Sequence, residues 1–109
     1  MDFKELQKEI HQCAVDHGWW SNGNRNIPEC LCLIHSEVSE ALEDYRTGNM
    51  NASTDFVTTK PIGFPSELAD IIIRTMDLAE ALGIDLEEAV RIKKEYNKIR
   101  PYRHGGKLA

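Results

Sequence analysis

The sequence has no excess of positive charge and no long run of apolar residues. Its formal net charge is −5, whereas nucleic-acid grooves and anionic membrane surfaces favour basic stripes. No apolar run approaches the roughly 18 residues of a membrane span, and the opening residues, MDFKELQKEIHQ, lack the apolar core of a signal peptide. We therefore expect a cytoplasmic protein that binds neither a nucleic-acid polymer nor a membrane.

Cysteine is also scarce. The chain has three cysteines, an odd number that does not suit a disulfide framework. Cys30 and Cys32 with His35 resemble a fragment of a zinc site, but a second cysteine pair and a fourth ligand are missing. Internal repeats and low-complexity tracts are absent as well. With 109 residues, 41% of them hydrophobic, the chain suits a single domain over residues 1–109.

Apolar residues recur at helical steps of three and four in four segments. The expected helices cover residues 2–17, 27–47, 65–82 and 86–100, and Asp85 with Glu88 forms a capping pair before the last. Residues 47–65 have no helical period and are expected to form a loop that includes a short extended segment. Residues 101–109 are expected to form a tail. This pattern predicts an all-α, four-helix bundle. In the second helix the expected inner stripe is centred near Val38 and includes Ile27, Leu31, Ile34, Ala41 or Leu42, and Tyr45.

Two of the expected helices carry acids one turn apart, Glu37 with Glu40 and Glu67 with Asp70. The third helix is otherwise apolar on nearly every side, so its acids are expected to be partly buried. Two carboxylates about 5 Å apart repel by roughly 3 kcal/mol at an effective dielectric constant of about 20. An acid at a helix N-terminus gains only about 0.3–1 kcal/mol. If the helices pack together, the four acids must hold a cation, raise their pKa values or splay apart.

The four acids offer only carboxylate oxygens as metal ligands. Such ligands favour Mg²⁺, or Mn²⁺ as the alternative, whereas zinc prefers histidine and cysteine. A di-iron bundle would use Glu-x-x-His pairs, and no glutamate here has a histidine three residues later. The same acidic spacing also occurs on solvated helix faces, as Glu40 with Glu43 illustrates. The acids alone therefore leave a surface role open.

The fourth helix has an apolar stripe, Leu86 and Val90, that becomes polar at Lys93, Asn97 and Arg100. A solvated helix end would look the same, because basic residues complement the helix dipole. If the stripe continues inward, it places two cations and an amide opposite the acids, which is an arrangement that binds phosphate.

Three stretches, EVSEALEDYR, ELADIIIRTMDLAEALGIDLEEAV and KKEYNKIRPYRHGGK, together resemble the MazG-type nucleoside triphosphate pyrophosphohydrolases. The motif of that all-α family is Glu-x-x-Glu, a variable gap and Glu-x-x-Asp, and 26 residues separate Glu40 from Glu67 here. The resemblance covers residues 27–107. It implies Mg²⁺-dependent hydrolysis of a nucleoside triphosphate, deoxy and non-standard nucleotides included, to the monophosphate and pyrophosphate.

The resemblance also implies roles for individual residues. Metal ions would neutralise phosphate oxygens and lower the pKa of a bound water, and Glu40 or Glu37 would orient or deprotonate that water. The base would stack on one of the two adjacent tryptophans, Trp19 and Trp20, and Trp20 is the candidate. Two aromatic residues that close one end of the core would give the same sequence pattern. The metal ligands would be Glu37, Glu40, Glu67 and Asp70, and Lys93, Asn97 and Arg100 would contact phosphate or ribose.

Members of the family typically form a homodimer or a dimer of dimers, so the bundle is expected to be completed by dimerisation, with Ile92 and Ile99 as the candidate seam. The competing hypothesis is a non-catalytic helical interaction module or a nucleotide-binding regulator. Glu40→Gln separates the two, since it abolishes hydrolysis only in an enzyme.

Overall fold

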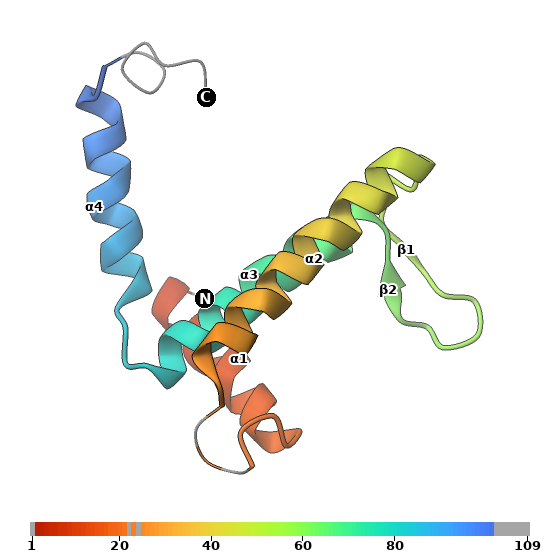
Figure 1. Ribbon diagram of the computed structural model, residues 1–109, viewed down its shortest axis with the longest axis horizontal. Helices are drawn as coiled ribbons and strands as arrows, with labels where there is room; N and C mark the ends of the chain where they lie inside the picture. The colour runs from red at the N-terminus through yellow and green to blue at the C-terminus, as the bar shows by residue number, and fades with distance from the viewer. Residues whose placement is uncertain (1, 22, 24, 102–109) are drawn as a thin grey trace.

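The computed structural model describes residues 2–21, 23 and 25–101, and four helices account for most of them. This confirms the predicted all-α fold class. Within the described part, no helix has the length and apolar character needed to cross a bilayer. The elements in chain order are α1 (Phe3–Asp16), α2 (Ile27–Thr47), β1 (Ser53–Thr54), β2 (Pro61–Ile62), α3 (Phe64–Ala81) and α4 (Leu86–Ile99) (Figure 1).

Local capping explains where the helices begin and end. The Asp85 carboxylate accepts a hydrogen bond from the Glu88 backbone N–H at 3.0 Å, which confirms the predicted cap of α4. Gly48 ends α2 in the left-handed conformation, with φ of 80°, a geometry that glycine adopts without steric cost. The third helix begins at Phe64 and ends at Ala81, with Gly63 at the N-cap position, a shift of one residue at either end from the expected range.

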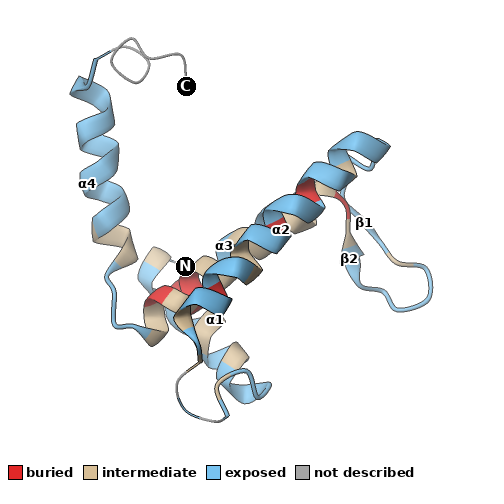
Figure 2. Ribbon diagram, in the orientation of Figure 1, coloured by how far each residue is buried: buried red, intermediate tan, exposed pale blue. Residues whose placement is uncertain are grey.

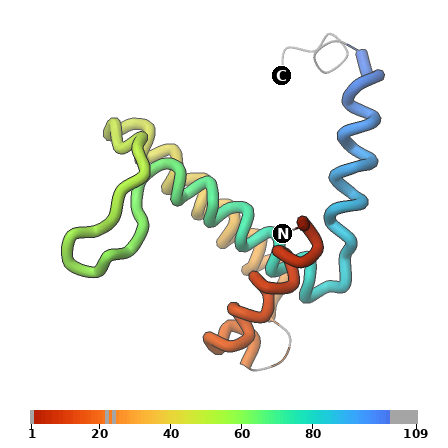
Figure 3. Tube along the Cα trace, turned by 180° about the vertical axis from the view of Figure 1, so that it is seen from behind, coloured from red at the N-terminus to blue at the C-terminus, as the bar shows by residue number. Residues whose placement is uncertain are grey.

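Helices α2 and α3 lie side by side and run in opposite directions, while α1 packs against the C-terminal half of α3 (Figures 1 and 3). The interior between these three helices is thin. Its buried hydrophobic side chains, within the described residues, are Cys30 and Ala41 from α2 and Met76 and Ala79 from α3.

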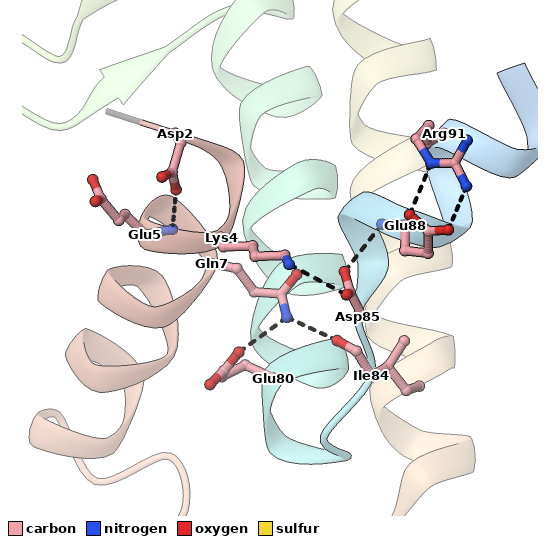
Figure 4. A network of polar contacts seen from close by, with 9 residues as sticks. All are labelled: Asp2, Lys4, Glu5, Gln7, Glu80, Ile84, Asp85, Glu88 and Arg91. Carbon is pink, nitrogen blue, oxygen red and sulfur yellow. Dashed lines mark hydrogen bonds and ion pairs between the residues drawn. The ribbon is translucent and has the colours of Figure 1, made fainter.

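Helix α4 projects away from the other three helices, and none of its residues is buried (Figure 2). A network at its base connects it to α1 (Figure 4). The buried Gln7 amide donates to Glu80 Oε1 at 3.0 Å and to the Ile84 carbonyl at 3.1 Å, and Lys4 lies 3.4 Å from Asp85. The radius of gyration is 16.5 Å, compared with about 13 Å for a compact chain of this length. The single chain is therefore more extended than a closed bundle.

The expected inner stripe of α2 is wrong in its direction. Val38 is 50% exposed, whereas its neighbour Glu37 is 7% exposed. The face that packs against α3 is centred on Cys30, Glu37 and Ala41, so it contains the acid and Ala41 of the expected stripe, and most of the larger stripe residues lie outside it. The exposed stripe residues are Leu31, Val38, Leu42 and Tyr45.

Candidate active site

The acids are positioned by the turn that reverses the chain between α2 and α3. Strands β1 and β2 pair antiparallel, with Ser53 opposite Ile62. Gly63 follows with φ of 103°, and a Cβ atom there would lie 2.3 Å from the Asn51 carbonyl oxygen. The next residue, Phe64, donates its backbone N–H to the Asn49 carbonyl at 2.9 Å. These contacts fix the first turn of α3, which carries Glu67, against the end of α2.

Three of the predicted ligands converge in the structure. One carboxylate oxygen from each of Glu37, Glu67 and Asp70 lies within 4.8 Å of the other two. Glu37 is buried, and Glu67 and Asp70 are half-buried. The fourth acid, Glu40, is exposed but lines the same cleft. The i, i+3 spacing therefore brings the acids of the two helices together across their interface.

The cluster contains more negative charge than its surroundings balance. Burial, followed by the nearby carboxylates of Glu40 and Glu37, raises the pKa of Glu67 to about 7. Burial and the Glu37 charge also raise the pKa of Asp70. The cations of Arg74 and Lys60 act in the opposite direction on Asp70, but the net shift remains upward.

Arg74 compensates only part of this charge. Its Nε donates to Glu37 Oε1 at 2.9 Å. Among the described residues, the buried oxygens Glu37 Oε2 and Glu67 Oε2 have no hydrogen-bond partner. Such oxygens are costly to bury unless a cation or donor satisfies them. Two unsatisfied oxygens beside a third carboxylate form an all-oxygen donor set that fits Mg²⁺ or Mn²⁺.

The acids occupy one end of a cleft of about 590 Å³, a volume typical of small-molecule sites. Lys60 and Arg74 line the cleft near these acids. Helix α1 and the following turn line the part beside Asp77, in the C-terminal half of α3. The residues of this part, the aromatic end, are Ile10, Cys13, Ala14, His17, Trp19 and Arg25. The cleft therefore joins a charged region to an aromatic and apolar one.

Sequence reasoning missed a polar cluster around Asp77, which is 7% exposed. His11 Nδ1 donates to Asp77 Oδ1 at 2.7 Å, and Trp20 Nε1 donates to the same oxygen at 3.0 Å. Arg25 Nη1 lies 3.8 Å from Asp77 Oδ2. Asp77 had a sequence signal, since it follows Asp70 and Arg74 on α3 at helical steps of four and three. Its partners, however, come from α1 and from the loop before α2.

The remaining predicted residues lie elsewhere. Trp20 directs its indole N–H to Asp77, whereas Trp19 lines the cleft. Lys93 and Asn97 border a shallow groove on α4, and Arg100 follows at its end. Within one chain these three residues do not line the acidic cleft. The predicted tail beyond Pro101 falls outside the described residues.

Comparison with known proteins gives one partial relative. A dATP/dGTP diphosphohydrolase of Cyanophage S-2L is 45% identical over 38 residues, which cover 35% of this chain and 36% of the relative. The matched segment thus spans about a third of either protein. No protein-family model matches the chain, and no solved structure matches it.

Proposed function

We propose that the protein is a Mg²⁺-dependent nucleoside triphosphate pyrophosphohydrolase that releases a monophosphate and pyrophosphate. The observation that carries the proposal is the pair of unsatisfied, buried oxygens on Glu37 and Glu67, next to Asp70. A donor set of this kind is expected to bind a hard divalent cation. The name of the partial relative supports deoxypurine triphosphates as the substrate class.

The cleft suggests how a nucleotide would be held. Glu37, Glu67 and Asp70 would hold the metal, which when bound supplies positive charge to phosphate oxygens and favours deprotonation of water. Glu40, exposed at the edge of the cluster, is the candidate to orient the attacking water or to complete the ligand set. Lys60 is the candidate to contact phosphate at the same end of the cleft.

The base would then lie at the aromatic end of the cleft. Trp19 is the indole that lines the cavity, so it replaces Trp20 as the candidate for stacking. Trp20 would instead support the wall, through its bond to Asp77. The two ends together allow a triphosphate and a base to bind in one cavity.

A homodimer, or a dimer of such dimers, would complete the bundle. Large apolar side chains are exposed on the free faces of the chain, and burying them would stabilise an assembly. In such an assembly, α4 of one subunit could bring Lys93, Asn97 and Arg100 to the cleft of another. The exposed apolar residues on α3 and α4 include Leu68, Ile72, Val90, Ile92, Tyr96 and Ile99.

The test is to incubate the purified protein with Mg²⁺ and a panel of deoxynucleoside and ribonucleoside triphosphates. Pyrophosphate and monophosphate are the expected products, and orthophosphate alone would contradict cleavage between the α and β phosphates. Glu40→Gln should abolish turnover while the protein stays folded. Glu43→Gln, an exposed acid one turn away on the same helix, is the matched control and should retain activity.

The exposed apolar faces also favour a second candidate, a helical interaction module whose acids have no catalytic role. This candidate predicts no product with any triphosphate. It also predicts that Glu40→Gln and Glu43→Gln behave alike.

A further inference from the structure

Arg25 lies at the aromatic end of the cleft in an unusual environment. Its guanidinium carbon lies 5.4 Å from the centre of the Trp19 ring and 5.1 Å from that of Trp20. Its side chain is only 18% exposed, yet the residue lines the cavity. Cation–π contacts with two indoles hold the guanidinium in place.

Within residues 2–21, 23 and 25–101, no protein acceptor takes a hydrogen bond from the Arg25 N–H groups. The ion-pair partner of Arg25, Asp77 Oδ2, is 3.8 Å from Nη1, which balances the charge but is too long for a hydrogen bond. The Asp77 carboxylate instead accepts from His11 and Trp20. No hydrogen bond from Arg25 occurs within the described residues. The cleft wall therefore presents a fixed, partly desolvated group that can only donate.

A guanidinium group, which has only N–H donors, discriminates between the two purines. Guanine presents two adjacent acceptors, N7 and O6, whereas adenine presents the N7 acceptor beside the N6 amino donor. Arginine binds the guanine pair with two parallel hydrogen bonds. Opposite adenine, it would face the amino group with another donor, and a partly buried donor would lose its partner.

We propose that Arg25 is a specificity-determining residue that selects guanine over adenine by donating to N7 and O6 of the base. This inference rests on the proposed function and deepens it. Trp19 and Trp20 hold the guanidinium, and Asp77 balances its charge. A bidentate contact of this type favours the matching base by roughly 5- to 150-fold.

The experiment measures kcat/KM for four substrates: dGTP, dATP, dITP and 7-deaza-dGTP. dITP retains N7 and O6 but lacks the 2-amino group, so it should be hydrolysed about as well as dGTP. 7-Deaza-dGTP lacks the N7 acceptor and should be slower, and dATP should be slower still. Arg25→Met should reduce the preference for dGTP over dATP to near unity, because kcat/KM for dGTP falls much more than kcat/KM for dATP.

Two further variants act as controls. Arg46→Met removes an exposed arginine at the end of α2 and should leave the preference unchanged. Arg25→Lys keeps the charge but loses the planar fork, so the preference should fall although the cation remains. Retained dATP hydrolysis by Arg25→Met shows that the variant is folded.

Three results would overturn the inference while the proposed function stands. They are an equal loss of dGTP and dATP hydrolysis in Arg25→Met, equal rates with dGTP and 7-deaza-dGTP, or a preference for dCTP, whose O2 and N3 are also adjacent acceptors. If the wild-type protein hydrolyses no triphosphate, the proposed function itself fails, and the inference fails with it.

Discussion

The excess negative charge between α2 and α3 predicts that the metal-free protein loses stability as the pH rises. Glu67 has a pKa of about 7 in the folded protein, compared with 4.5 for an unperturbed glutamate. Below about pH 4.5 this carboxyl is protonated in both states, so its contribution to stability is fully present. Between pH 4.5 and 7 the unfolded chain releases the proton first, and the free energy of unfolding falls.

The size of this effect follows from the two pKa values. At about 1.36 kcal/mol per pKa unit, the interval from 4.5 to about 7 corresponds to at most roughly 3 kcal/mol, since solvent in the open cleft screens part of the repulsion. For a domain of this size, that loss lowers Tm by roughly 10–20 °C. The raised pKa of Asp70 acts in the same direction. The lowered pKa values of Asp55, Asp85 and Glu88 act only at more acidic pH, below their unperturbed values.

The assay is thermal denaturation in EDTA between about pH 5 and pH 8, repeated with excess Mn²⁺. An ion that binds only the folded state, at a free concentration of about 100 times its Kd, adds roughly 2.7 kcal/mol to the free energy of unfolding. This gain should be larger at pH 8, because the ligands must be deprotonated. Glu67→Gln should flatten the pH dependence, and Glu43→Gln should retain it. A Tm that is constant or rises with pH in EDTA, or an unchanged slope in Glu67→Gln, would refute the reasoning.

Three other changes test the surroundings of the cleft. Lys60→Met should raise KM for the triphosphate several-fold with the Mn²⁺ effect on Tm intact, because Lys60 lines the acidic end but supplies no ligand; an unchanged KM would remove its proposed phosphate contact. Gly63→Ala should destabilise the protein by roughly 1–3 kcal/mol in urea denaturation, since φ is 103° and the added Cβ would meet Asn51; wild-type stability would mean that this turn relaxes freely. Asp77→Asn should cost roughly 1–3 kcal/mol and speed hydrogen exchange at the Trp20 indole, because it removes the charge that His11, Trp20 and Arg25 surround; unchanged exchange would contradict that role.

Local signals predicted the elements well, because caps and turns depend on neighbouring residues. Asp85 begins α4 and Gly48 ends α2 as expected, and the i, i+3 acids converge because helical spacing fixes which side chains share a face. The facing direction of α2 was not predictable in the same way. The hydrophobic effect favours burial of its apolar stripe, yet in the single chain the flank with Glu37 packs against α3.

The Asp77 cluster shows a different limit of sequence reasoning. Its four members come from three places: α1, the loop that precedes α2, and α3. Their spacing along the chain carries no periodic signal. Only the packing of α1 on α3 brings His11 to Asp77. The position of α4 was also not predictable. The spacing of Lys93 and Asn97 suits a phosphate-binding helix face, but it does not indicate which subunit this face would approach.

Large apolar side chains stay exposed in the single chain and its carboxylate cluster is only partly balanced by cations, so the proposed assembly and the proposed metal site can be tested together. Met76 and Ala79 are buried, but Ile72 and Ile92 remain more than half exposed, so association should contribute to stability. If a dimer is the folded form, tenfold dilution should cost about 1.4 kcal/mol and lower Tm measurably. Mn²⁺ should raise Tm by the same amount at each protein concentration if the cluster lies within one chain, because independent contributions add. A metal effect that disappears on dilution would instead mean that residues of a second chain complete the site.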